Sequence, residues 1–208
     1  MSDSAREPAS DSPRRPRWVE DADRLDLAVY AAIARTPTPA LDRVMSRLSR
    51  AADYSRLWLA SAGVLAVAGG RGGRRAATMG LASLAVTATL TNVVAKPLWR
   101  RRRPDRLAQE VPLARHVRMP TSRSFPSGHS AAAFAFAAGV GHIAPPAALP
   151  LRVLAAAVAY SRVHTGVHYP GDVLAGAVMG TALAQLTTHA LHRHGPNPGS
   201  LRRGATGP

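Results

Sequence analysis

The chain has 208 residues, no cysteine and a formal net charge of +15, and Lys96 is its only lysine. This length suits a single domain, and the lack of cysteine excludes disulfides and thiolate metal sites. Aromatic residues make up only 5% of the chain, and the arginines gather at the ends of apolar runs. We therefore expect the basic residues to meet lipid headgroups, and we expect no nucleic-acid partner.

The first part of the chain is polar and then weakly amphipathic. Residues 1–22 are rich in Ser, Pro and charges of both signs, which predicts a disordered tail. Residues 23–35 carry apolar side chains at helical spacing over a length too short to span a membrane, so they predict an interfacial helix. A second short helix is predicted over 40–50. The tail at 193–208 is also predicted to be disordered, which leaves residues 23–192 as one membrane domain.

Apolar runs in the rest of the chain predict the membrane spans. The clearest run is 76–95, an uncharged stretch long enough to cross the hydrocarbon layer. The other candidates are shorter, and their many small residues favour close helix packing in lipid. They are 57–70 with an extension over 51–56, then 130–144, 151–160 and 173–191, with turns at 71–75 and 144–150. The fold class we expect is all-α: an integral membrane helical bundle with about five spans plus an N-terminal interfacial helix.

Three polar clusters interrupt these apolar runs. They read KPLWRRRRP at 96–104, FPSGH at 125–129 and SRVHTGVHYPGD at 161–172. The segment between the second and third clusters has the length of one helix out, a turn and one helix back. We therefore expect all three clusters at the same membrane face.

The second cluster opens an apolar helix. Ser127 is the expected N-cap, and the free amides of Gly128 and His129 at the positive end of the helix dipole favour an anion. A lone arginine at the end of a span usually marks topology, and residues 100–102 are interpreted in that way. Lys96, Arg103 and Arg162 converging on this helix start would instead form a pocket for a doubly charged, oxygen-rich group.

The third cluster pairs an imidazole with a carboxylate. Pro170 and Gly171 interrupt a simple helical pairing of His168 with Asp172, so we expect Asp172 to begin the last helix and also to reach His168. A carboxylate on one ring nitrogen makes the other nitrogen more basic and nucleophilic. His129 across the pocket is the candidate proton donor.

The three clusters together resemble the signature of the type 2 phosphatidic acid phosphatase superfamily. The matching positions, in order and spacing, are Lys96, Arg103 and Pro104, then 126–129, then Ser161, Arg162, His168 and Asp172. The resemblance implies a phosphohistidine on His168, supported by Asp172, with His129 as the acid and Lys96, Arg103, Ser127, Gly128 and Arg162 as phosphate ligands. It also implies no metal and no other cofactor. His164 has no role in the signature and is interpreted as a pocket-edge residue, and His142 as a turn residue.

The function expected is therefore hydrolysis of a lipid phosphate or diphosphate by an integral protein of the plasma membrane. Two alternatives stay open: a vanadate-dependent haloperoxidase with a similar anion pocket, and a non-enzymatic membrane protein that binds anionic lipid. The sequence does not specify the lipid or the oligomeric state. The basic residues favour a cytoplasmic site, but several of them are also candidate phosphate ligands, so both sides of the membrane stay open.

Overall fold

The computed structural model describes residues 16–99 and 101–194, and these residues form helices joined by turns and one long loop. Regular structure in this part of the chain is entirely helical, as predicted. The helices are α1 Arg17–Arg35, α2 Pro39–Ala51, α3 Arg56–Ala68, α4 Gly70–Leu90, α5 Lys96–Leu98, α6 Gly128–Ile143, α7 Pro145–His164 and α8 Pro170–His194. Short 3₁₀ turns cover Asp53–Ser55 and Leu113–Arg115, and a π-helical turn covers Thr91–Ala95.

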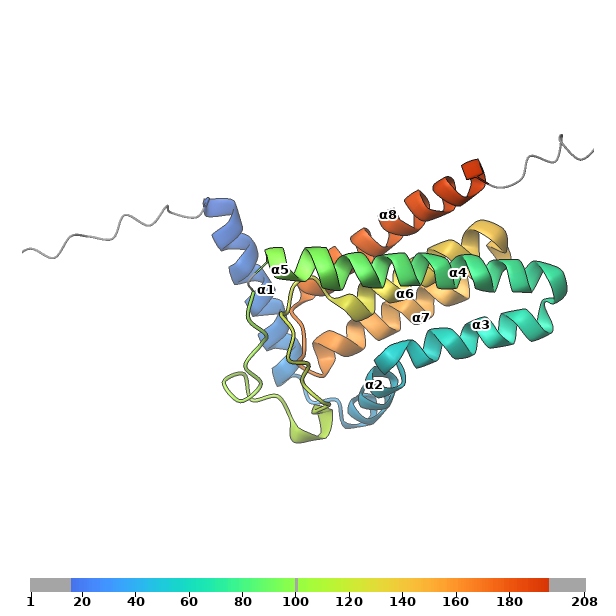
Figure 1. Ribbon diagram of the computed structural model, residues 1–208. Coiled ribbons are helices and arrows are strands. Elements are labelled where there is room, and N and C mark those ends of the chain that lie inside the picture. The colour runs from blue at the N-terminus through green and yellow to red at the C-terminus, as the bar shows by residue number, and fades with distance from the viewer. Residues whose placement is uncertain (1–15, 100, 195–208) are drawn as a thin grey trace, which may run out of the picture.

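The long helices form a bundle whose two ends differ (Figure 1). α3, α4, α6, α7 and α8 run along the bundle, while α1 and α2 lie across one end together with the loop between α5 and α6. The other end holds the α3–α4 and α6–α7 turns and the end of α8. The helix topology therefore brings the three polar clusters to one end of the bundle, as the sequence predicts.

The bundle interior is built from small side chains. Ala131, Ala133, Ala135 and Ala137 on α6 are all buried, and a Cβ on Gly180 of α8 would collide with the backbone of Ala131. In lipid there is no hydrophobic driving force between helices, so the close packing of small residues is what holds α6 and α8 together.

The larger apolar side chains lie mostly on the outside of the bundle. Exposed examples occur on four of the long helices: Leu59, Val64 and Val67; Val86 and Leu90; Leu149 and Val153; Leu174, Val178 and Leu186. An exposed apolar surface of this extent is typical of contact with a membrane rather than with water. One helical segment of the described chain, Gly70–Leu98, is by itself long and apolar enough to cross a bilayer.

Several predicted boundaries are wrong. α1 begins at Arg17, so residues 17–22 are helical rather than part of a disordered tail, and Arg24 supports this first part through ion pairs with Glu20 and Asp21. At the other end, α8 continues to His194. The predicted tails otherwise fall on residues 1–15 and 195–208, which lie outside the described residues.

The predicted turn at 71–75 is also wrong. The chain reverses at Gly69 and Gly70, and Arg71 is already helical. Gly73 is a site of close approach, because a Cβ there would collide with the carbonyl of Leu65 on α3. These glycines therefore allow α3 and α4 to pack together instead of breaking a helix.

The predicted turn at 144–150 is also helical from Pro145 onward, and the predicted run at 151–160 is part of a longer helix. α7 begins at Pro145. Proline is tolerated in the first turn of a helix, because the backbone N–H that it lacks would have no partner within the helix. The same helix continues through Arg162 to His164 and ends before Gly166, whose φ is +71°. The predicted extension of the first span over 51–56 is interrupted as well, because Tyr54 and Ser55 adopt left-handed backbone conformations between α2 and α3.

Candidate active site

His168 lies in the turn between α7 and α8, and its ring is held between a carboxylate and a guanidinium. Its Nδ1 is 3.3 Å from Oδ2 of Asp172, and its Nε2 is 3.2 Å from Nη1 of Arg103. Because a guanidinium only donates hydrogen bonds, Nε2 accepts and the ring proton lies on Nδ1. The lone pair of Nε2 is therefore directed toward the cationic group. Burial, aided by the charge of Arg103, lowers the pKa of His168 to about 3, which keeps the ring neutral at pH 7.

Asp172 is fully buried in the first turn of α8, and several donors hold its carboxylate. Ser124 donates a hydrogen bond to Oδ2, as does the backbone amide of Tyr169 at 3.0 Å. Nη1 of Arg101 contacts the other oxygen at 3.0 Å. The carboxylate thus accepts from the amide that precedes the helix and reaches His168 at the same time, as predicted, although α8 begins at Pro170 rather than at Asp172.

The prediction that Arg101 is only an interfacial residue is wrong. Its guanidinium also contacts Asp26 at 2.6 Å and Asp23 at 3.2 Å on α1, and it lies over the ring of Tyr169. Asp26 in turn accepts a hydrogen bond from the amide of Gly171. The first helix is thereby fastened to the turn that carries the His168–Asp172 pair. Of its neighbours, Arg102 is exposed, and Arg100 lies outside the described residues.

Lys96 and Arg103 approach each other through Ser122. Nζ of Lys96 lies 3.2 Å from Oγ of Ser122, and Nη2 of Arg103 lies 3.3 Å from the same atom. The π-helical turn at the end of α4 delivers Lys96 to this position, and such turns are frequent at functional sites. Two cations that share one neutral hydroxyl provide an electrostatic cradle for an anion.

The start of α6 borders this cradle. Ser127 is the N-cap and accepts a hydrogen bond from the amide of Ser130, so this prediction is confirmed. The amide of Ser127 donates to the carbonyl of Asp172 at 2.9 Å, which joins the starts of α6 and α8. A Cβ on Gly128 would lie 3.5 Å from Nζ of Lys96. The free amides of the helix start therefore lie beside Lys96, as anion binding requires.

His129 and Arg162 meet at an acid that the sequence analysis missed. Nε2 of His129 lies 3.0 Å from Oδ1 of Asp53, and Nη1 of Arg162 lies 3.6 Å from the same oxygen. Arg162 is almost fully buried and also donates to Oγ of Ser49 at 2.6 Å. The hydrogen bond from His129 holds the pKa of Asp53 below its usual value, so the carboxylate is ionised at pH 7.

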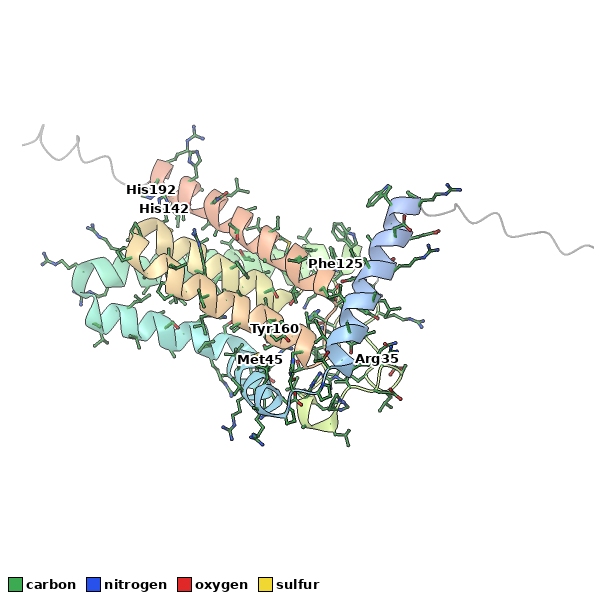
Figure 2. All side chains as sticks on the ribbon, turned by 180° about the vertical axis from the view of Figure 1, so that it is seen from behind. Arg35, Met45, Phe125, His142, Tyr160 and His192 are labelled. Carbon is green, nitrogen blue, oxygen red and sulfur yellow. The ribbon has the colours of Figure 1, made fainter. Side chains whose placement is uncertain are left out.

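Two other histidines lie elsewhere than predicted. His164 is not at the pocket edge: it is buried, and its Nε2 lies 2.9 Å from Oδ1 of Asp42, which also accepts from the buried Arg115. His142 lies within α6, in its last helical turn, rather than in a loop between helices. Its Nε2 lies 2.8 Å from Nε2 of His192. Figure 2 shows this pair far from the end of the bundle that carries Arg35 and Met45.

Two cavities adjoin the polar site. One, of about 310 Å³, is lined by Asp53, Tyr54, 118–122 and His129. The other, of about 180 Å³, continues from Lys96, Gly128 and His129 to apolar side chains of three helices: Trp58, Ala88 and Ala132. Tyr54 and His129 line both cavities. The polar site thus adjoins a cavity that reaches apolar side chains of α3, α4 and α6.

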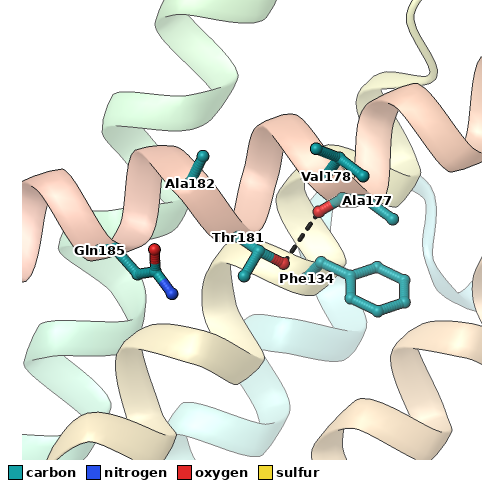
Figure 3. Close-up of a pocket in the computed structure, with 6 residues that line it drawn as sticks. All are labelled: Phe134, Ala177, Val178, Thr181, Ala182 and Gln185. Atoms are coloured by element: carbon teal, nitrogen blue, oxygen red, sulfur yellow. Dashed lines mark hydrogen bonds between the residues drawn. The ribbon is translucent and has the colours of Figure 1, made fainter.

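A larger hollow lies away from this chemistry. Its volume is about 420 Å³, and it is lined by Phe134 on α6 and by Ala177, Val178, Thr181, Ala182 and Gln185 on α8 (Figure 3). The hydroxyl of Thr181 is hydrogen-bonded to its own helix, at the carbonyl of Ala177. This hollow contains none of the predicted site residues, and its apolar walls suit lipid chains.

The structure therefore brings the eight predicted residues to one end of the bundle. Ser127 and Gly128 lie at the start of α6, and the other six form two groups joined by hydrogen bonds or ion pairs. The group around His168 contains Asp172, Arg103 and Lys96, and the group around Asp53 contains His129 and Arg162. The backbone carbonyl of Arg162 accepts from the amide of His168 at 3.2 Å and joins the two groups. Within the described residues, no cluster of three or more His, Cys, Asp or Glu side chains forms a candidate metal site.

Comparisons with known proteins assign the family. A sequence profile of the PAP2 superfamily, the type 2 phosphatidic acid phosphatases, matches residues 77–196. The chain belongs to the PAP2 superfamily. It is 33% identical over 171 residues to a decaprenylphosphoryl-5-phosphoribose phosphatase of Mycobacterium tuberculosis, a match that covers 81% of this chain and 92% of that protein. The protein of the same name from Mycolicibacterium smegmatis is 35% identical over 173 residues, which cover 80% and 84% of the two chains.

Solved PAP2 structures share the fold. The crystal structure of a transmembrane PAP2-type phosphatidylglycerolphosphate phosphatase from Bacillus subtilis superimposes with a TM-score of 0.64 at 25% identity, covering 85% of this chain and 89% of that one. LpxE of Aquifex aeolicus also gives a TM-score of 0.64, at 24% identity, covering 79% and 95%. The protein is thus a PAP2-type lipid phosphate phosphatase with a transmembrane fold. Its named relatives are phosphatases rather than haloperoxidases or non-enzymatic lipid-binding proteins.

Proposed function

We propose that this PAP2 protein removes the terminal phosphate from a polyprenyl lipid that carries a phosphorylated headgroup, by way of a phosphohistidine on His168. The observation that carries the proposal is the accepting Nε2 of His168, which faces Arg103 while Asp172 holds Nδ1–H. An imidazole in this tautomer has its lone pair directed into a cationic pocket, as attack on a phosphate requires.

In the first step, the phosphate monoester occupies the cradle formed by Lys96, Arg103, Arg162 and the amides at Gly128. Nε2 of His168 forms a bond to phosphorus while the bond from phosphorus to the headgroup oxygen breaks. His129 acts as its imidazolium: Nε2–H stays on Asp53, which holds the ring in place, and the Nδ1 proton passes to the departing oxygen. The cations offset the charge on the oxygens that do not react.

In the second step, water completes the reaction. His129, now deprotonated, accepts a proton from the water as its oxygen attacks phosphorus. The N–P bond breaks, inorganic phosphate leaves, and His168 returns to its neutral form. Asp172 stabilises the positive charge that the ring of His168 carries in the intermediate. No step in this scheme requires a metal or another cofactor.

The proposed placement in the membrane follows from the long helices. At 1.5 Å per residue, α7 and α8 are about 30 Å or longer, which matches the hydrocarbon thickness. α3 and α6 are shorter. We infer five crossings by α3, α4, α6, α7 and α8 of the plasma membrane, with α1 and α2 at the interface beside the site. Residues 23–192 would then be one membrane domain.

The substrate class is inferred from the relatives and from the two adjoining cavities. The names of the two mycobacterial proteins denote a prenyl lipid joined through one phosphate to a sugar that bears a second phosphate. A headgroup of that kind fits a polar cavity that opens onto an apolar one.

The test is phosphate release in detergent with EDTA present. The substrates are decaprenylphosphoryl-5-phosphoribose, phosphatidylglycerolphosphate and phosphatidic acid. We expect release to be fastest from the prenyl lipid and to be lost in His168→Ala, but kept in Arg47→Gln, which removes an exposed charge from α2. Equal release from His168→Ala, or preference for phosphatidic acid, would contradict the proposal.

A further inference from the structure

A single cation, Arg118, lies at the mouth of the polar cavity, outside the cradle described above. It lines the same cavity as His129 and Ser122. Its Nη1 lies 3.1 Å from the hydroxyl of Tyr54, which is a neutral partner. No carboxylate among the described residues forms an ion pair with Arg118, so its charge is available to an anion.

Tyr54 is held at this mouth by an unusual backbone. It has a φ of +56°, and Ser55 has a φ of +59°. Residues other than glycine rarely adopt this left-handed backbone conformation. The ring is largely exposed, lines both cavities, and carries the guanidinium of Arg56 at 5.3 Å from its centroid. Outliers of this kind cluster at ligand sites, where the surrounding structure holds them.

We propose that Arg118 and Tyr54 form a second anion subsite, which binds the phosphodiester that links the headgroup to the lipid tail. This inference rests on the proposed function. The terminal phosphate would lie in the inner cradle, the sugar or glycerol beside His129, and the tail along Trp58 and Ala88 between α3 and α4. Since the hydroxyl of Tyr54 accepts from Arg118, its own proton is free for a phosphate oxygen.

The subsite explains how the enzyme would distinguish lipids with two phosphates from those with one. Phosphatidic acid places its only phosphate in the inner cradle and leaves Arg118 without an anion. A headgroup with a monoester and a diester engages both sites. Arg118 is thus a specificity-determining residue for the second phosphate and makes no contact with the one that is hydrolysed.

Kinetics on two matched substrates test this claim. We expect Arg118→Gln to lower kcat/KM for phosphatidylglycerolphosphate by about tenfold to a hundredfold, the effect of one charged hydrogen bond, and to change that for phosphatidic acid with the same acyl chains by less than about threefold. Tyr54→Phe should give a smaller loss in the same direction. Arg47→Gln is the matched control and should affect neither substrate. Equal losses on both substrates, or none on either, would overturn the subsite.

A binding measurement separates this proposal from the proposed function. Glycerol 1,3-bisphosphate should raise the melting temperature of the unmodified protein more than glycerol 3-phosphate does, and Arg118→Gln should abolish the difference. If the two compounds stabilise equally, the subsite is wrong even where phosphate release is found. If inorganic phosphate alone matches the bisphosphate, Arg118 binds free anions and the lipid phosphodiester is not its ligand. If no lipid releases phosphate but the bisphosphate advantage persists, the proposed function fails and the subsite stands.

Discussion

Nη1 of Arg103 lies 3.2 Å from Nε2 of His168, on the side of the ring opposite to Asp172. The two contacts determine both the tautomer and the direction of the lone pair. In the proposed reaction Arg103 thereby contacts the attacking nitrogen directly, and an incoming phosphate would take over its hydrogen bond.

The first prediction concerns the protonation of His168. Its pKa is lowered from 6.5 to about 3, chiefly by burial. The ring should therefore stay neutral from pH 8 down to about pH 4.5, where a histidine of the unfolded chain would be protonated. Because the unfolded chain binds this proton below pH 6.5, the group makes folding less favourable as the pH falls. The measurement is ¹⁵N NMR of labelled histidines in detergent, with His168→Asn for assignment. A midpoint near 6.5 for this ring would contradict the account.

The second prediction separates Arg101 from its neighbour Arg102. Arg101 contacts Asp172 and fastens α1 to the turn at Tyr169, whereas Arg102 is exposed. We expect Arg101→Gln to lower kcat by about tenfold to a hundredfold, because Asp172 would lose a charged partner. Arg102→Gln should stay near the unmodified value. Rates of phosphate release for the two variants provide the measurement, and similar losses in both would show that Arg101 acts only as surface charge.

The third prediction concerns Asp53, which contacts both His129 and Arg162. Asp53→Asn should lower kcat on a lipid substrate by about tenfold or more, because the general acid would be poorly oriented. A substrate with a good leaving group, such as p-nitrophenyl phosphate, needs little proton transfer and should lose much less. Glu20→Gln on α1 is the control. Equal losses on both substrates would exclude a role of Asp53 through the acid.

The fourth prediction concerns the contribution of Arg115 to stability, away from His168 and Asp172. Arg115 is fully buried, with its guanidinium between Asp42 and the carbonyls of Ile33 and Thr36. Arg115→Leu leaves Asp42 with an uncompensated buried charge and should cost about 3–5 kcal/mol. Thermal unfolding in detergent should show a clearly lower melting temperature, while the exposed Arg43→Gln changes little. An unchanged melting temperature for Arg115→Leu would contradict this role.

The contribution of Asp42 to folding stability depends on pH in a direction that follows from its pKa. Burial alone raises the pKa of Asp42, but hydrogen bonds from Thr38, His164 and Arg115 lower it below 3.8. The carboxylate therefore contributes stability above the unfolded value of 3.8, and this contribution is lost as the pH falls through the folded value. Asp42→Asn should weaken the acid dependence of the melting temperature.

The sequence predicts the parts of the site that lie in regular patterns. Ser127 and Gly128 open an apolar run, and the spacing of His168 and Asp172 around a proline places both residues at one helix start. These features follow from local physics of helix ends. The helical bundle likewise follows from the apolar runs, although their limits shifted where Pro145 and Gly73 turned out to be helical.

The rest of the site depends on tertiary contacts. Nothing in the order of the arginines at 100–102 indicates that Arg101 faces Asp172, because that contact joins the loop between α5 and α6 to the first turn of α8. Asp53 is an acid in a short break between two helices, which is also how a simple turn residue looks. His164 contacts Asp42, which lies 122 residues away in the chain, so the sequence alone could not assign this partner.

The most direct test of the account is to trap the phosphorylated enzyme. A ³²P-labelled lipid phosphate is mixed with the protein in detergent with EDTA, and the reaction is quenched in base, in which phosphohistidine is stable. We predict label on the peptide that contains His168, and none in His168→Asn, while Arg47→Gln is labelled normally. Label on another residue, or rapid phosphate release by His168→Asn, would contradict the central claim.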